Sequence, residues 1–315
     1  MGRPATHAGT PNADTIRGTS GNDVIAALGG DDVVYGSGGD DLICGGTGKD
    51  VLKGGRGDDR VLGGRRGDSI FGMKGSDTAD GGRGGDTIHM GSGIDFINAD
   101  EGNDRISGGR NYDRLFFSKW TKPVTVNLGR GVSRGAGADK LVRGTIEAVY
   151  GTEYDDRLVG DARANFLYGG PEGGGDDVLL GRGGDDELLG LDGIDVLRGG
   201  AGDDVLEGGG ENDTIVGGEG TDLALFGRGY EIAGQGVTVD LSQGTATGYG
   251  NDSLESIENV EGSSEDDTLI GDAADNVLRG KRGDDSLDGR ERTDTLRGGR
   301  GTDDCVNGEE NKGCE

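Results

Sequence analysis

Polar and apolar positions recur with one fixed spacing along most of this chain. From Asp14 to Asp113 an aspartate occurs every nine residues without a slip, and an aliphatic residue follows two positions later. Eleven of the twelve aliphatic positions hold Ile, Val or Leu, and Ala79 is the exception. Glycines gather before each aspartate. Because a disordered chain needs no such register, the spacing indicates a folded repeat.

The same phase returns in two later runs. The aspartates in phase are Asp14, Asp23, Asp32, Asp41, Asp50, Asp59, Asp68, Asp77, Asp86, Asp95, Asp104 and Asp113, then Asp156, Asp177, Asp186, Asp195, Asp204, Asp213 and Asp222, and last Asp267, Asp285, Asp294 and Asp303. Asn165 and Asn276 occupy the same position without a charge, and three extra residues near Pro171 lengthen one repeat.

Two longer segments interrupt the phase and match each other. Residues 124–128 correspond to 237–241 at an offset of 113, and residues 146–149 correspond to 257–260 at an offset of 111. The pattern therefore predicts three parts. Residues 1–116 hold the first repeat block, residues 117–226 an intervening β segment and the second block, and residues 227–315 the duplicated segment and the third block.

Each nonapeptide predicts a Gly-rich turn of six residues followed by a strand of three. The middle strand residue, the aliphatic one, points to one face and its neighbours to the other. Two nonapeptides then form one coil with a strand on each side, and coils stack about 4.8 Å apart. The sequence thus predicts an all-β fold, a right-handed parallel β-roll solenoid with a thin aliphatic core between two parallel sheets.

Composition and charge narrow the choice of partners. With 72 glycines, 30% hydrophobic residues and 4% aromatic residues, the chain cannot fill an ordinary core. Its formal charge of -28 repels nucleic acid and anionic membranes and attracts cations. We find no apolar run of the length that a membrane-spanning helix needs.

The stacked aspartates call for a cation. Asp14 would lie one coil from Asp32, and two charges about 5 Å apart repel by about 1 kcal/mol in water and about 3 kcal/mol at an effective dielectric constant of 20. Ca²⁺ takes six to eight oxygens and accepts both carboxylates and main-chain carbonyls. Stacked Gly/Asp turns offer both kinds of oxygen, so we expect multiple Ca²⁺ ions to decide whether the roll folds.

Residues 81–89 and 199–207 fit Gly-Gly-x-Gly-x-Asp-x-aliphatic-x in full. This array resembles the repeats-in-toxin (RTX, hemolysin-type) repeats of exported bacterial proteins. The resemblance implies a parallel β-roll, calcium between stacked turns, and folding after export to the cell exterior. Its metal-binding position falls on every aspartate of the three runs, with weaker or absent sites at Asn165 and Asn276. Glu147 and Glu258, nine residues before Asp156 and Asp267, are open as ligands.

No enzyme active site is expected. Residues 131–135 match the Gly-x-Ser-x-Gly nucleophile elbow, but Ala246 replaces Ser133 in the duplicate, and both histidines, His7 and His89, precede the serine. We therefore expect an extracellular calcium-binding protein with a structural or interaction role. The alternative is a calcium-dependent C-terminal module of a larger exported enzyme or adhesin. A cell-surface partner or self-association through the solenoid ends stays open.

Side chains outside the repeat have simple expected roles. Cys305 and Cys314 favour a disulfide that closes the last coil, with free thiols or a metal pair as alternatives, and Cys44 is left unpaired. The aromatic residues at the start of the interrupting segments are expected to pack them onto the roll. Those residues are Tyr112, Phe116, Phe117 and Trp120 in the first segment and Phe226 and Tyr230 in the second. Recurrent basic residues, such as Arg56 and Lys74, are interpreted as partial charge balance.

Overall fold

A computed structural model describes residues 4–117, 119–171, 174–227 and 234–314. Within these ranges the chain has strands and turns but no helix, so none of the described segments is a helix that could cross a membrane. The chain divides into two compact units, Met1–Tyr150 and Gly151–Glu315.

The first unit consists of short strands in chain order. They are β1 (His7–Ala8), β2 (Thr15–Arg17), β3 (Val24–Ala26), β4 (Val33–Tyr35), β5 (Leu42–Thr47), β6 (Val51–Arg56), β7 (Arg60–Arg65), β8 (Ser69–Lys74), β9 (Thr78–Arg83), β10 (Thr87–Ser92), β11 (Phe96–Asn98), β12 (Arg105–Arg110), β13 (Arg114–Phe116), β14 (Thr125–Asn127), β15 (Val132–Arg134), β16 (Ala138–Leu141) and β17 (Ala148–Tyr150).

The second unit repeats this organisation. Its strands are β18 (Arg157–Val159), β19 (Phe166–Tyr168), β20 (Val178–Gly183), β21 (Glu187–Leu191), β22 (Val196–Ala201), β23 (Val205–Gly209), β24 (Thr214–Glu219), β25 (Leu223–Leu225), β26 (Thr238–Asp240), β27 (Thr245–Thr247), β28 (Asn251–Glu255), β29 (Asn259–Glu261), β30 (Thr268–Ile270), β31 (Val277–Arg282), β32 (Ser286–Asp288), β33 (Thr295–Arg300), β34 (Asp304–Val306) and β35 (Glu310–Lys312).

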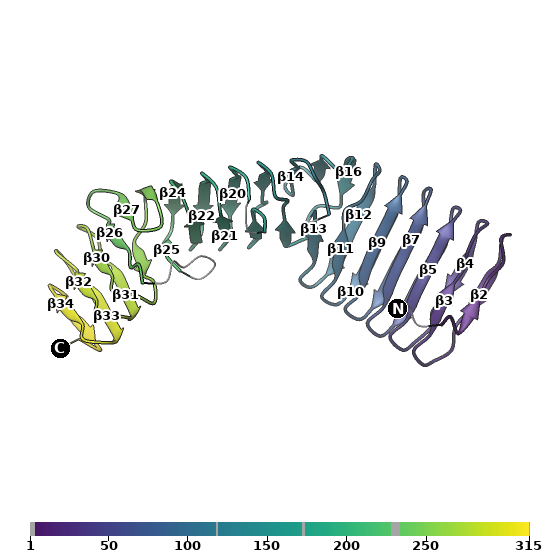
Figure 1. Cartoon of the computed structure of the whole chain (residues 1–315), viewed down its shortest axis with the longest axis horizontal. Helices are drawn as coiled ribbons and strands as arrows, with labels where there is room; N and C mark the ends of the chain where they lie inside the picture. Colours follow the sequence, from purple (N-terminus) through teal and green to yellow (C-terminus); the bar gives the residue numbers. More distant parts are fainter. Residues whose placement is uncertain (1–3, 118, 172–173, 228–233, 315) are drawn as a thin grey trace. The chain divides into compact units, whose positions relative to one another are not determined.

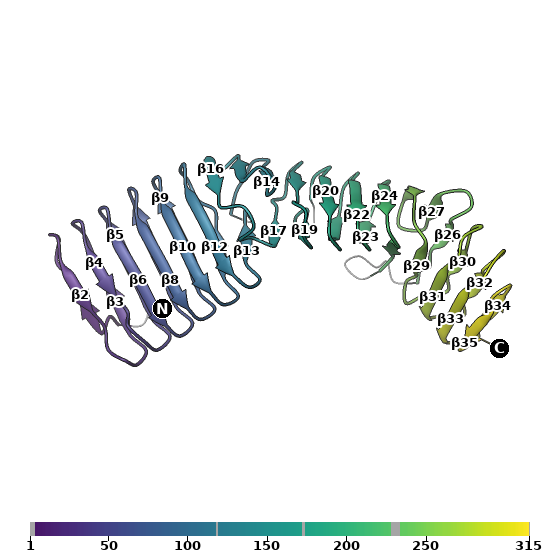
Figure 2. The same cartoon turned by 180° about the vertical axis from the view of Figure 1, so that it is seen from behind.

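Successive strands alternate between two parallel sheets, so one coil takes two nonapeptides. In the first unit Ile25 pairs with Ile43 and Leu52 with Ile70, each 18 residues apart. Strands β3, β5, β7 and β9 therefore lie side by side in chain order, as Figures 1 and 2 show. The three extra residues near Pro171 are absorbed in one coil, because Leu158 pairs with Leu179, 21 residues later. The predicted parallel β-roll is confirmed.

The core is a double row of aliphatic side chains between the two sheets. Ile43, Leu52 and Leu197 are fully buried, as the alternation predicts, while Ile16 at the N-terminal edge is only half-buried. Many strands differ from the predicted three residues, because glycines of the following turn also pair with the next coil. Gly46 pairs with Gly64, for example, and β5 reaches Thr47.

The interrupting segments add antiparallel strands to one sheet. In the first unit β12 pairs parallel with β16, and β16, β15 and β14 then form an antiparallel meander. The second unit has the same arrangement in β28, β27 and β26, and β26 leads back into the parallel ladder through β30. Both meanders therefore extend the sheet. The coils before and after the second meander run in the same direction.

Aromatic residues fasten the first segment to the roll, as expected. Phe117 is fully buried, and the Phe116 ring stacks on Tyr150 with 4.4 Å between ring centroids. The Trp120 indole donates a 3.0 Å hydrogen bond to the Ala99 carbonyl. Phe226 of the second segment is likewise buried, whereas Tyr230 lies outside the described residues. The described aromatic residues at the start of each segment thus pack that segment onto the roll.

A disulfide closes the C-terminal end. Cys305 and Cys314 are bonded, with their Cα atoms 5.7 Å apart, which confirms the predicted pairing. Cys305 pairs in register with Leu287 of the previous coil, so the covalent link joins the last parallel strand to the tail. Cys44 is free and half-buried, and burial raises the pKa of its thiol.

The thin core predicts a large penalty for a buried truncation. Ile97→Ala removes a fully buried side chain and should lower the free energy of unfolding by about 2–5 kcal/mol. The matched control is Ile94→Ala, three residues earlier and 43% exposed, which should change it by less than about 0.5 kcal/mol. Thermal unfolding followed by circular dichroism at saturating calcium measures both. Equal losses in the two variants would contradict the assigned core.

Candidate metal sites

The two oxygens of each repeat aspartate have different surroundings. Oδ1 accepts a hydrogen bond from the main-chain N–H of the aspartate one coil earlier, as in Asp50 N–H to Asp68 Oδ1 at 2.8 Å and Asp186 N–H to Asp204 Oδ1 at 2.7 Å. This bond recurs along both units and forms a ladder down each side of the roll. Each carboxylate is thereby held in one orientation.

The same orientation leaves Oδ2 buried without a donor. Among the described residues, eighteen repeat aspartates have a buried Oδ2 with no hydrogen-bond partner. They are Asp32, Asp41, Asp50, Asp59, Asp68, Asp77, Asp86, Asp95, Asp113, Asp177, Asp186, Asp195, Asp204, Asp213, Asp222, Asp285, Asp294 and Asp303. We call these the unpaired positions. A buried unpaired carboxylate oxygen costs several kcal/mol unless a cation or proton meets it.

At several unpaired positions a main-chain oxygen of the next coil lies close to Oδ2. A Cβ built on Gly36, five residues before Asp41, would lie 2.3 Å from Asp41 Oδ2 and 2.5 Å from the Gly54 carbonyl oxygen of the next coil. At Gly181 the corresponding distances to Asp186 Oδ2 and the Gly199 oxygen are 2.2 and 2.6 Å. Calcium–oxygen contacts span 2.3–2.6 Å. The absence of a side chain at these glycines therefore leaves a carboxylate oxygen and a carbonyl oxygen facing one small space.

Main-chain oxygens must supply most of any ligand set here. No group of three or more His, Cys, Asp or Glu side chains is gathered in the part of the chain that the structure describes. Each turn offers one buried carboxylate together with carbonyls, and Ca²⁺ accepts such mixed oxygen sets, whereas zinc prefers nitrogen and sulfur. The donor chemistry of the turns therefore fits calcium.

Burial also changes the acidity of these carboxyl groups. Burial, reinforced by the Asp59 charge one coil away, raises the pKa of Asp77 to about 7. Burial likewise raises the pKa of Asp68 to about 7 and of Asp195 to about 8. The metal-free fold thus resists holding these groups as anions, because nothing in the turn compensates their charge.

Comparison with protein families agrees with this chemistry. The profile of the RTX calcium-binding nonapeptide repeat matches more than half of the residues, in overlapping segments within 9–115, 150–224 and 255–311. The chain belongs to this RTX repeat family. No match was found among curated proteins. The residues between the matched segments include both antiparallel meanders.

Five of the predicted RTX ligands are not among the unpaired positions. They are Asp14, Asp23, Asp104, Asp156 and Asp267. In Asp23 the Thr19 main-chain N–H and hydroxyl both donate to Oδ2, at 2.6 and 2.9 Å, and the N–H bond holds the pKa of this carboxyl below its ordinary value. Asp14, Asp156 and Asp267 likewise accept a main-chain N–H from four residues earlier at Oδ2, whereas Asp104 belongs to neither group. The structure thus separates positions that the nine-residue spacing treats as one.

The ladder also contains acids that the spacing misses. Asp139 and Asp252, one in each meander, accept the N–H of Asp104 and Asp213 at 3.0 Å. They follow their partners by 35 and 39 residues, so a period of nine does not find them, although the offset of 113 between the duplicated segments relates them. Glu309 does the same for Asp294 at 2.7 Å.

Glu147 and Glu258 also accept ladder bonds. Their Oε2 atoms receive the N–H groups of Asp113 and Asp222, at 2.9 and 2.8 Å. The three glutamates each stand where a run of aspartates ends or nears its end.

The serine of the elbow motif has a structural partner. Ser133 is buried, and its hydroxyl donates to Asp139 Oδ2 at 2.6 Å, so it orients the ladder acid of the meander. His7 lies 3.4 Å from Asp23, and the His89 ring stacks on Phe71. Among the described residues, neither histidine is hydrogen-bonded to this serine.

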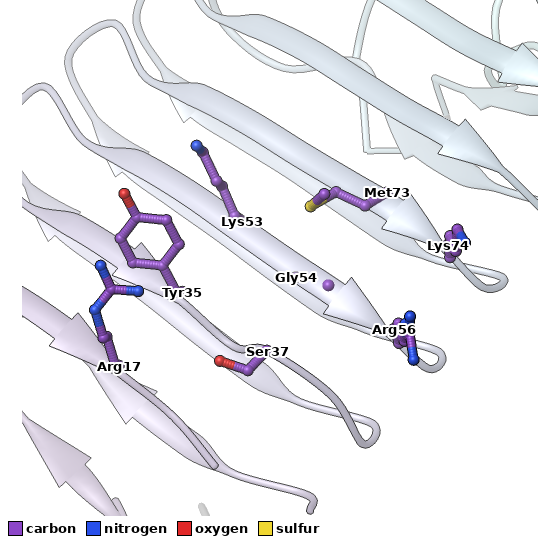
Figure 3. A pocket seen from close by; sticks show the side chains of 9 residues that line it. Arg17, Tyr35, Ser37, Lys53, Gly54, Arg56, Met73 and Lys74 are labelled. Atoms are coloured by element: carbon purple, nitrogen blue, oxygen red, sulfur yellow. The ribbon is translucent and has the colours of Figure 1, made fainter. Parts of the chain in front are cut away.

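Figure 3 shows a different cavity, on the outer face of β4, β6 and β8. It has a volume of about 480 Å³ and is lined by Arg17, Tyr35, Ser37, Lys53, Gly54, Gly55, Arg56, Met73 and Lys74. The Arg17 guanidinium and the Lys53 ammonium lie over the Tyr35 ring, 4.3 and 5.1 Å from its centroid. Among the described residues none of the four cations is in an ion pair. We call this surface the basic groove.

The raised pKa values predict that acid can replace metal. In chelator the contribution of Asp68, Asp77 and Asp195 to stability is fully present below their ordinary pKa and is lost as pH rises through about 7–8. The metal-free chain should therefore show strand signal in far-ultraviolet circular dichroism near pH 5 and lose it near pH 9. A strand signal in chelator that is the same at pH 5 and pH 9 would contradict the assignment of buried, uncompensated carboxylates to the unpaired positions.

Proposed function

We propose that this chain is an extracellular calcium-binding protein whose β-roll is stabilised by Ca²⁺ at the unpaired positions, and that it acts as a non-catalytic structural or interaction element. The observation that carries the proposal is the buried, unpaired Oδ2 beside a carbonyl oxygen of the next coil. The same roll could serve as a calcium-dependent module of a larger exported enzyme or adhesin.

Calcium supplies charge compensation that the turns lack. An ion between stacked turns meets the unpaired oxygens and replaces the repulsion along each aspartate column by attraction. If the sites have the affinity of extracellular calcium modules, each one filled at about 10 mM calcium adds about 1–3 kcal/mol. Because the sites share ladder bonds, neighbouring coils should fill together.

Two features support a setting outside the cell. The Cys305–Cys314 disulfide persists in an oxidising compartment. Millimolar calcium, which sites of this affinity require, is typical of extracellular modules. In this proposal the chain stays open while calcium is scarce and folds where calcium is abundant.

A calcium titration tests the central mechanism. At neutral pH, adding Ca²⁺ from chelator to about 10 mM should convert coil to strand cooperatively in far-ultraviolet circular dichroism, while Mg²⁺ should not. Mg²⁺ fails because it demands a near-octahedral set and loses its water reluctantly. A strand signal that is complete in chelator and unaffected by calcium would overturn the mechanism.

Two glycines of one turn provide the matched variants. Gly36→Ala puts a Cβ between Asp41 Oδ2 and the Gly54 carbonyl oxygen of the next coil, so the chain should bind at least one ion fewer in equilibrium dialysis. Gly38→Ala is the control, because its Cβ would have no neighbour nearer than 3.7 Å. Equal calcium stoichiometry in the two variants would exclude this turn as a site.

The basic groove favours a specific interaction role. Arg17, Lys53, Arg56 and Lys74 gather there in a chain whose net charge is -28, and stacking on Tyr35 holds two of them in place. Such a surface suits a carboxylate-rich polysaccharide, whose repeated charges can lie along the stacked strands. Calcium at the aspartate columns would lower the repulsion that such a ligand meets from the rest of the roll.

Binding to polygalacturonate, with neutral dextran as control, tests this role. The double variant Arg17→Gln/Lys53→Gln should weaken binding at least tenfold at low salt, since two contacts to carboxylates are lost. Arg134→Gln/Lys140→Gln, which removes the same charge outside the groove, should change it less than threefold. If both pairs weaken binding equally, net charge and not the groove is responsible.

A further inference from the structure

Six repeat positions are closed by the chain itself. At each of them the residue four positions earlier is Thr, Ser or Asp, and its main-chain N–H donates to the side-chain oxygen of the repeat residue at 2.6–2.8 Å. The pairs are Thr10 with Asp14, Thr19 with Asp23, Thr152 with Asp156, Asp161 with Asn165, Ser263 with Asp267, and Asp272 with Asn276. We call these the capped positions.

The capping side chain also closes the turn locally. The Thr152 hydroxyl donates to Asp156 Oδ1 at 3.1 Å and accepts the Tyr154 N–H at 3.1 Å. Ser263 makes the same two kinds of bond, to Asp267 at 2.8 Å and from the Glu265 N–H at 3.1 Å. At Asp23, Asp156 and Asp267 both carboxylate oxygens therefore have hydrogen-bond donors, so a cation has no unsatisfied oxygen to meet there.

Backbone conformation separates the two classes. Before the unpaired positions, wherever the residue four earlier is described, it has a left-handed φ, even where it is not glycine, as in Met73 (88°), Arg182 (88°) and Lys281 (81°). The capping residues have no such φ. A left-handed non-glycine residue costs about 1 kcal/mol or more. Where that residue is not glycine, the turn of an unpaired position thus carries a conformational cost that the capped turns do not.

Capped positions occur in pairs, and each pair forms the first coil of a run of repeats. Asp14 and Asp23 open the first run, Asp156 and Asn165 the second, and Asp267 and Asn276 the third. Asparagine stands at two of these six positions and at none of the unpaired ones. A neutral amide is tolerated where no cation has to be held, which is consistent with the division.

Each capped coil also orients the carboxylates of the coil that follows. The main-chain N–H groups of Asp156 and Asn165 donate to Asp177 Oδ1 and Asp186 Oδ1, both at 2.7 Å. Asp177 and Asp186 are unpaired positions, so the capped coil fixes the first candidate metal ligands of its block. Its own closing bonds span only four residues, which makes them the least costly in chain entropy.

Building on the calcium-binding function proposed above, we infer that each block begins with a coil that binds no calcium. This coil is closed by Thr, Ser or Asp caps, and it is the preformed start on which the calcium-dependent coils of its block assemble. We call it the starter coil. The starter coils span residues 9–26, 151–168 and 262–279, and the ladder bonds pass their geometry to the metal sites.

Counting bound calcium separates the two classes of position. In the full chain at saturating calcium, Asp156→Asn should leave the number of ions measured by equilibrium dialysis unchanged, because the position is capped. Asp177→Asn, one coil later, should lose at least one ion. If both variants lose calcium, the starter coil is wrong while calcium binding stands. If neither does, the proposed calcium positions themselves are wrong.

Hydrogen exchange in chelator tests whether the starter coils form first. Amides of residues 151–168 should exchange at least fivefold more slowly than those of residues 178–195. Thr152→Val should abolish about fivefold of that protection, the value of one hydrogen bond, and Thr152→Ser should keep it. Uniform exchange across both segments, or equal protection in the Val and Ser variants, would overturn the inference.

Discussion

The fold depends on an aspartate whose two oxygens have separate tasks. At the unpaired positions Oδ1 accepts the main-chain N–H of an aspartate or asparagine one coil earlier, so these carboxylates are anchored by the coil that precedes them. The same bond turns Oδ2 inward, where it faces the carbonyl of the next coil and has no donor of its own. One side chain thus transmits the register of the roll and creates its need for a cation. A cation-free roll would keep the register and bear the cost of the buried charge.

This division explains how two long meanders can interrupt the repeat. Asp139 and Asp252 take the ladder bond where a repeat aspartate would stand, and Ser133 holds the first of them in place. The N–H of the preceding aspartate therefore keeps an acceptor while the chain makes its antiparallel excursion. An inserted segment must therefore place an acceptor oxygen at the ladder position. The number of residues in that segment can vary.

Sequence reasoning recovered what depends on the period of nine. The parallel roll, the inward aliphatic row, the paired C-terminal cysteines and the lengthened coil near Pro171 all follow from spacing and residue type. It treated every aspartate in phase as equivalent, because the period does not report whether Thr19 or Gly46 stands four residues earlier. That residue decides whether the turn supplies its own donors. The nine-residue period did not find long-range acceptors such as Asp252, because their spacing is irregular.

The placement of the caps follows from how a solenoid grows. A coil in mid-block inherits its geometry from the coil before it, whereas the first coil of a block has no earlier repeat in its own run to copy. Local caps such as Thr152 and Ser263 remove that dependence, because all their closing partners lie within a few residues. Carboxylates with an unpaired Oδ2 then occur only beyond the first coil, where ladder bonds already orient them. Asn165 and Asn276 mark the border, since they keep the ladder geometry and omit the charge.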